Sequence, residues 1–164
     1  MATVVALIGI QRQRRRGRAA AARSVGAMGA IHTIRRGATW VHLGLALLVA
    51  AGVFVQVYLI GAYIFGAGSE ALDAHRSVGF TVHAFEVLVL IVALMAWLPG
   101  ADLGLSLLMA VLGTSQVALA SAERWTGALH PLFALFVLAL GAVLVQRDLR
   151  LRRHHAARPV PSTA

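Results

Sequence analysis

Residues 56–83 read QVYLIGAYIFGAGSEALDAHRSVGFTVH, and this stretch decides the fold. It begins inside one apolar segment, crosses a short acidic loop, and enters a second apolar segment that opens with His75 and carries His83 two turns later. Downstream, Gln116 in QVAL is followed across a short polar loop by His130 in LHPLFALFV. The repeat predicts two helical hairpins that each present a glutamine and then a histidine to a shared interior, which is one way to build a cofactor site in a membrane bundle.

The composition is that of an integral membrane protein. The chain has 164 residues, is 59% hydrophobic and has a mean hydropathy of +0.79, whereas soluble domains are about 45 to 50% apolar. It contains no cysteine. This excludes disulfides, cysteine-ligated iron–sulfur clusters, thiolate chemistry and a covalently attached c-type haem.

The charge is basic and unevenly placed. The formal net charge is +9, and all 15 basic residues are arginine. Arginine is concentrated in 12–36 and 147–158, with only Arg76 and Arg124 between these ranges. Arginine clusters that flank apolar spans mark the cytoplasmic side and bind anionic lipid headgroups. We therefore expect a lipid bilayer as partner and no nucleic acid.

Four apolar segments predict an all-α fold, an integral membrane four-helix bundle with up-down-up-down order. No charged residue occurs in 37–69, which exceeds the roughly 20 residues that cross a bilayer. The predicted transmembrane domain is 37–146, with spans at about 40–65, 77–98, 103–122 and 129–145.

The loops and tails predict the orientation. The loop 66–74 is acidic and is expected outside, as is a second loop at 123–127. Residues 1–36 are expected to form a basic cytoplasmic tail, poorly ordered apart from possible surface helix, and 147–164 a second basic cytoplasmic tail. Both termini of a multi-pass membrane protein are then expected in the cytoplasm.

Polar groups share one stripe of the second span. At 100° per residue, His75, Gly79, His83 and Glu86 fall on one helical face. Such groups should point into the bundle, because facing lipid is costly. His83 lies roughly 12 Å deeper than His75. Glu86 is one turn from His83, and the two predict either a proton relay or a structural hydrogen bond.

The fourth span repeats this arrangement. His130, Ala134, Val137 and Gly141 share a face, so a small residue, Gly79 or Ala134, follows each leading histidine by one turn. A flat macrocycle held by axial imidazoles needs room of that kind. His75 and His130 are expected at the start of their helices on the same side of the membrane and at comparable depth.

Other interpretations of single residues stay open. His75 beside Arg76 also fits a solvated helix mouth, and His130 before Pro131 also fits a cap. Glutamines in membrane helices commonly bind neighbouring helices, while here Gln56 and Gln116 are also candidates to hydrogen-bond a ligand or to orient a histidine. His42 is expected at the interface. The tail histidines are expected to be solvated: His32, His154 and His155. Four glycines are expected to permit close helix packing: Gly44, Gly52, Gly61 and Gly113.

The order QVYLIGAYIF, short loop, DAHRSVG, then TSQVALAS and LHPLFALF, resembles one four-helix half of the haem A synthase type of membrane protein. It is also similar to a family of small bacterial four-helix membrane proteins whose function is not established. The resemblance covers about 40–146. It implies that His75 and His130 are haem-iron ligands. The enzyme has two such halves and this chain one, so the resemblance implies haem binding more than synthase activity.

The leading hypothesis is a b-type haem protein of the bacterial plasma membrane, with His75 and His130 as axial ligands, which exchanges electrons with a quinone or a redox membrane subunit. With both axial positions filled, this hypothesis favours electron transfer over an enzymatic reaction at the iron. A second hypothesis is a cofactor-free membrane scaffold or accessory subunit. A third is proton or metal-ion passage through His75, His83 and Glu86. A homo-oligomer fits each of them.

Overall fold

The computed structural model describes residues 2–121 and 124–156, and in those residues all regular structure is helical. The helices are α1 (Ala2–Ile64), α2 (Ser69–Met95), α3 (Gly100–Leu119), the single turn α4 (Arg124–Gly127) and α5 (Leu129–Ala156). Four segments are long and apolar enough to cross a membrane: Thr33–Ile64, Ser69–Met95, Gly100–Leu119 and Trp125–Arg153. The all-α fold is confirmed, and the four apolar helices fit a multi-pass membrane protein.

The chain divides into two compact units, Met1–Gly37 and Ala38–Ala164. The described part of the first unit is wholly helical, where the sequence predicts a poorly ordered tail with possible surface helix. Alanine and arginine are among the strongest helix formers, and no proline interrupts them. The solvated state predicted for His32, His154 and His155 lies outside the side chains that the structure describes.

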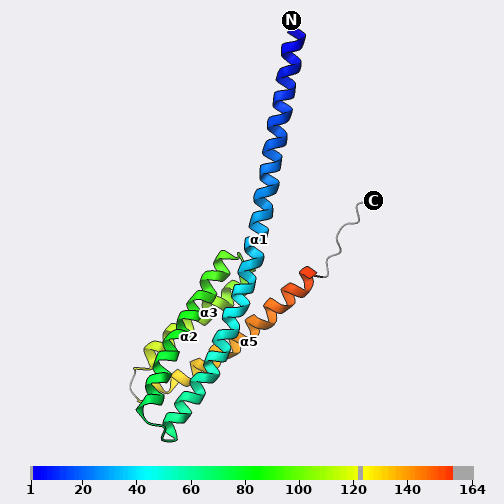
Figure 1. Ribbon diagram of the computed structural model, residues 1–164. Coiled ribbons are helices and arrows are strands. Elements are labelled where there is room, and N and C mark those ends of the chain that lie inside the picture. The colour runs from blue at the N-terminus through cyan, green and yellow to red at the C-terminus, as the bar shows by residue number, and fades with distance from the viewer. Residues whose placement is uncertain (1, 122–123, 157–164) are drawn as a thin grey trace. The chain divides into compact units, whose positions relative to one another are not determined.

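The second unit is a bundle of α2, α3, α5 and the part of α1 that begins at Ala38 (Figure 1). Short connections join successive helices, and hydrogen bonds between opposite helix ends fix their antiparallel course. The end of α1 is bonded to the start of α2, and the end of α3 to the start of α5. We call this the loop end, and the opposite end, with Trp40, Asp102 and Arg152, the tail end. Within each of these two pairs the helices run antiparallel.

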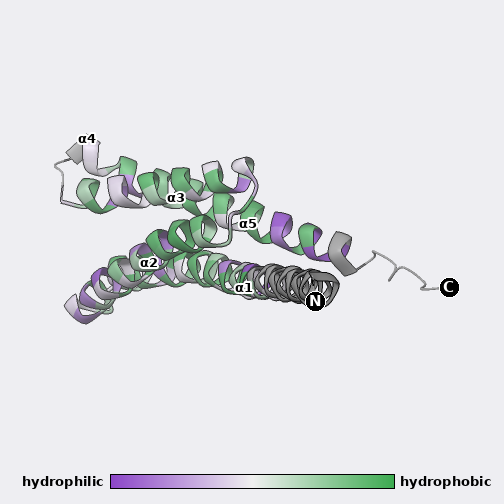
Figure 2. Cartoon of the chain, turned by 90° about the horizontal axis from the view of Figure 1, so that it is seen from above, coloured by the Kyte–Doolittle hydropathy of each residue, from purple (hydrophilic) through white to green (hydrophobic). Residues whose placement is uncertain are grey.

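Each long helix buries one narrow stripe. Buried positions recur three or four residues apart, which is the spacing of one helical face. Fully apolar members form one core: Ala46, Val49, Val53, Val82, Val89, Met109, Val137 and Leu144. Large apolar side chains elsewhere on the helices are exposed, and hydrophobic colour extends along them (Figure 2). A polypeptide with an apolar outside and polar groups within its interior stripes is suited to lipid as its solvent.

The first predicted loop, 66–74, is shorter in the structure, because α2 already begins at Ser69. Gly66 and Gly68 take positive φ values of 93° and 83° and make the turn. Glu70 then lies in the first turn of α2, where a negative charge complements the helix dipole. His75 is therefore almost two turns inside the helix and not at its mouth.

The last helix begins at Leu129, as predicted, but continues to Ala156, well beyond 145. Arg147 and Asp148 therefore lie on helix and pack against the bundle; Asp148 is 2% exposed. Residues assigned to a solvated tail by their charge are partly structural, because the α-helical period returns them to the buried face.

Two of the four expected packing glycines make close approaches. A Cβ added to Gly52 would lie 2.4 Å from a methyl of Val82, and one added to Gly113 would overlap the carboxylate of Glu86. A Cβ on Gly44 or Gly61 would meet no atom within 4 Å, so the prediction is wrong for these two residues.

Candidate functional site

Two histidines at the loop end are held in the same way. His75 Nδ1 lies 3.1 Å from the backbone carbonyl oxygen of Gln56, and His130 Nδ1 lies 2.9 Å from that of Gln116. A carbonyl only accepts, so in both rings Nδ1 carries the hydrogen and Nε2 is left with a lone pair. Among the described residues neither Nε2 has a protein partner. Ligating histidines are typically prepared in this way, because the bond at the second nitrogen fixes tautomer and orientation.

The glutamine side chains do not orient the rings; their main chains do. Gln56 Nε2 donates to the backbone carbonyl of His75 at 2.8 Å, which ties α1 to α2 a second time. The side-chain oxygen of Gln116 is buried without a partner among the described residues. The sequence repeat thus marks the correct positions, while the acceptor atoms belong to the backbone.

The two imidazole rings lie next to each other in an edge-to-face arrangement. Their ring centroids are 6.2 Å apart, and their planes meet at 72°. Two imidazoles that bind one metal from opposite sides, with metal–nitrogen bonds of about 2.0 to 2.1 Å, have centroids roughly 6.2 to 6.5 Å apart. The observed separation of the centroids lies at the lower end of this range.

A cavity of about 730 Å³ adjoins both rings. Gly79 and Ala134, the small residues one turn from each histidine, are in its wall, and so are both glutamines and Arg76. The Arg76 guanidinium bonds the Asp73 carboxylate at 3.3 Å, and both side chains are largely exposed. Most of the other lining residues are apolar, and this volume falls within the roughly 300 to 1,000 Å³ of small-molecule sites. The structure therefore combines all six predicted cofactor residues in one site.

His83 and Glu86 form a second polar group on α2, nearer the middle of the bundle. His83 Nδ1 is 3.0 Å from Glu86 Oε2, and Glu86 is fully buried. The carboxylate occupies the space that a side chain at Gly113 would need. Its second oxygen, Oε1, has no partner among the described residues. Neither His83 nor Glu86 is in the cavity wall.

A third polar group, which sequence reasoning missed, lies at the tail end. His42, expected at the interface, is fully buried: its Nδ1 bonds Asp148 Oδ2 at 2.7 Å and its Nε2 lies 3.1 Å from Ser106 Oγ. Beside it the Arg147 guanidinium pairs with Asp102, whose side chain is 1% exposed. The spacing of residues along α3 could have predicted this burial. Asp102 and Ser106 continue, at intervals of three or four residues, the buried face that carries Met109, Gly113 and Gln116.

The order Asp148, His42, Ser106 has the hydrogen-bond pattern of a nucleophilic triad, but its surroundings do not suit that chemistry. Ser106 is fully buried and donates its hydroxyl to the Asp102 carbonyl at 2.8 Å. No substrate reaches such a hydroxyl. We interpret this group as a clamp between α1, α3 and α5, with Arg152 stacked on the Trp40 ring, 3.2 Å from its centroid, at the edge of the bundle.

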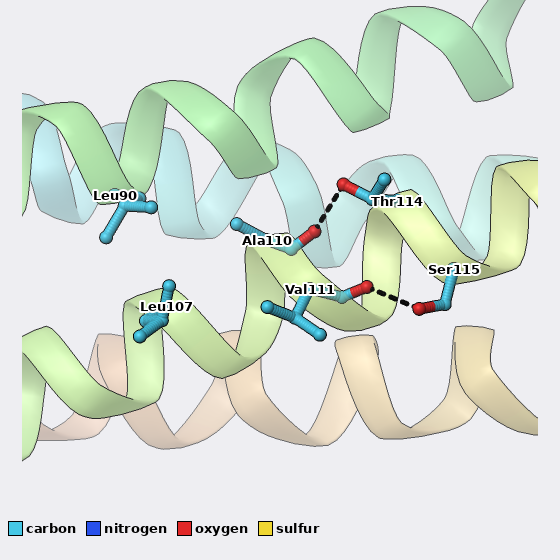
Figure 3. A pocket seen from close by; sticks show the side chains of 6 residues that line it. All are labelled: Leu90, Leu107, Ala110, Val111, Thr114 and Ser115. Carbon is cyan, nitrogen blue, oxygen red and sulfur yellow. Dashed lines mark hydrogen bonds between the residues drawn. The ribbon is translucent and has the colours of Figure 1, made fainter.

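A shallow groove also crosses the surface between α2 and α3 (Figure 3). Its hydroxyls are already bonded within their own helix, Thr114 to the Ala110 carbonyl and Ser115 to the Val111 carbonyl, both at 2.8 Å. Leu90 and Leu107 complete an apolar lining. The groove offers no free polar group to orient a ligand, unlike the cavity beside His75 and His130.

Comparison of the chain with protein-family models, with curated proteins and with solved structures gives no significant match.

Proposed function

We propose that the protein is an integral membrane protein that binds one b-type haem between His75 and His130 and takes part in membrane electron transfer. The observation that supports this most directly is the pair of imidazoles, each fixed through Nδ1, with Nε2 available and centroids 6.2 Å apart. The bundle would lie in the bacterial plasma membrane with both termini in the cytoplasm, because arginine is concentrated near the tail end.

The donor set favours haem over a bare metal ion. No group of three or more histidine, cysteine or acidic residues in the described residues is placed to hold a metal ion. A haem iron needs only two axial ligands from the protein, because the macrocycle supplies four nitrogens. Gly79 and Ala134 leave room beside the rings, and Arg76 at the cavity wall offers a positive charge for a haem carboxylate.

A bound haem would supply one-electron redox chemistry. The chain's residues would fix both axial nitrogens, surround the ring with apolar side chains and keep its carboxylates near Arg76. With both axial positions occupied by imidazole, the site would favour electron transfer over binding of a further ligand. The partner would be a membrane quinone or another redox subunit of the membrane.

The test is an optical spectrum of detergent-purified protein, oxidised and dithionite-reduced, with pyridine haemochrome to count haem per chain. The wild type should give a low-spin b-type spectrum. His75→Gly and His130→Gly should each lose it, and free imidazole should restore it. His154→Gly, which alters a histidine of the basic C-terminal stretch, is the matched control. Unchanged low-spin spectra in both glycine variants would refute the ligand assignment.

A colourless wild type, produced with ample haem, would favour the cofactor-free scaffold instead. The same preparation then answers a second question, namely whether a larger membrane complex co-purifies with the chain. A scaffold would retain its partner in His75→Gly and His130→Gly, because these changes lie inside the bundle and not on its lipid-facing surface.

A further inference from the structure

The His83 and Glu86 pair is built into the bundle at some structural cost. Glu86 is fully buried, and one of its oxygens has no partner among the described residues. A carboxylate in such a place is unfavourable unless it is paired or protonated. The space for it exists only because position 113 is glycine. A helix interface that needed packing alone would be filled by an apolar side chain here.

We propose that the His83 and Glu86 pair takes up one proton when the haem held by His75 and His130 is reduced; this inference rests on the proposed function. With Nδ1–H donating to Oε2, the pair as a carboxylate and a neutral imidazole has a charge of −1. One proton from water brings it to zero. A membrane quinol or a chemical reductant would supply one electron to the bound haem, so the added negative charge and the proton taken up would balance and no other bond would change.

The distance suits electrostatic coupling. His83 follows His75 by eight residues, roughly 12 Å along α2. At that distance, with an effective dielectric constant of about 20, one added electron strengthens proton binding about tenfold. The His83 side chain is 22% exposed, so protein does not enclose the pair on every side.

The other ionisable groups in the interior of the described bundle lie toward its two ends, whereas the His83 and Glu86 pair lies between them. At the level of Glu86, α1, α3 and α5 contribute uncharged residues to the buried interior. His75, His130 and Arg76 belong to the loop end. The tail-end group, which is His42, Asp102, Arg147 and Asp148, is separated from the pair by the buried side chains of Val49, Val89 and Met109. The pair is therefore the ionisable group in the interior best placed to respond to the iron without ligating it.

The test is a mediated redox titration of the haem-loaded protein over a range of pH. Raising the pH withdraws the proton and makes reduction harder, so the wild-type midpoint potential should fall with rising pH. Glu86→Gln should keep the haem and lose this dependence, whereas Glu70→Gln, the same change at an exposed position, should retain it. Haem-loaded wild type with a pH-independent potential, or Glu86→Gln with the wild-type dependence, would overturn the inference alone.

Redox-induced infrared difference spectra give a second measurement that does not depend on the folding of a variant. The reduced wild type should gain a protonated-carboxyl or imidazolium band, and Glu86→Gln should lack it. Absence of both bands from the wild type would overturn the inference. A wild type that binds no haem would overturn the proposed function and this inference together, which distinguishes the two failures.

Discussion

At the scale of single residues, His42 is held more completely than any other histidine whose side chain the structure describes. It is fully buried and touches Asp148 and Ser106 with its two nitrogens. His42 was expected at the membrane interface because it lies near the end of an apolar span. The sequence shows how far along the span a residue lies, whereas its burial depends on which helices meet there.

His42→Leu should therefore destabilise the protein strongly. The change leaves the Asp148 carboxylate buried beside an apolar side chain, and breaking a buried pair in this way costs about 3 to 5 kcal/mol. Thermal unfolding in detergent measures the loss. The double variant His42→Leu with Asp148→Leu should recover most of it, because no charge is then left unpaired. Additive losses would show that the two side chains are not coupled.

Gly113→Ala should also be destabilising, by about 1 to 3 kcal/mol, because its Cβ would overlap the Glu86 carboxylate. The matched control is Gly61→Ala, which meets open space in the helix and should be neutral or stabilising. Adding Glu86→Ala should rescue Gly113→Ala by removing the clash. Equal unfolding temperatures for the two single glycine variants would contradict this packing.

At the scale of elements, the four helices follow from the apolar segments, and the turn between α1 and α2 depends on glycine. Gly68 has φ 83° and ψ 179°, a conformation almost confined to glycine. Gly68→Ala should cost about 1 to 3 kcal/mol and weaken haem retention, because His75 is placed by the start of α2. Urea titration and haem release measure both effects, with Ala67→Ser as control. Unchanged values would show that the turn relaxes freely.

The sequence predicts which residues line the cavity, but it does not predict the main-chain contacts or the ion pair between α3 and α5. The repeat of a glutamine followed by a histidine predicts that Gln56, His75, Gln116 and His130 point to a shared interior, and all four line one cavity. It does not predict that the carbonyls of the glutamines accept from the rings, because main-chain contacts leave no trace in residue type. Asp102 falls just before the predicted third span at 103–122, and Arg147 begins the predicted tail at 147–164. Their pairing depends on how α3 and α5 meet, which periodicity along one helix does not encode.

At the scale of the whole molecule, the proposed orientation is testable because the chain has no cysteine. Ser69→Cys, beside the α1–α2 turn, should react with an impermeant thiol reagent in intact cells. Arg153→Cys, near the tail end, should react only after the membrane is opened. The reason is the arginine excess near that end, which retains it in the cytoplasm. The reverse pattern would invert the assignment.

The two hairpins share a feature that determines how mutation would affect them. Each ring is anchored to a peptide carbonyl, a group that every amino acid carries. Substitutions at positions 56 and 116 therefore change the wall of the cavity without deleting the acceptor that aims the histidine. Amino-acid changes at these two positions would leave both imidazoles oriented, because the path of the backbone places the carbonyl that each ring contacts.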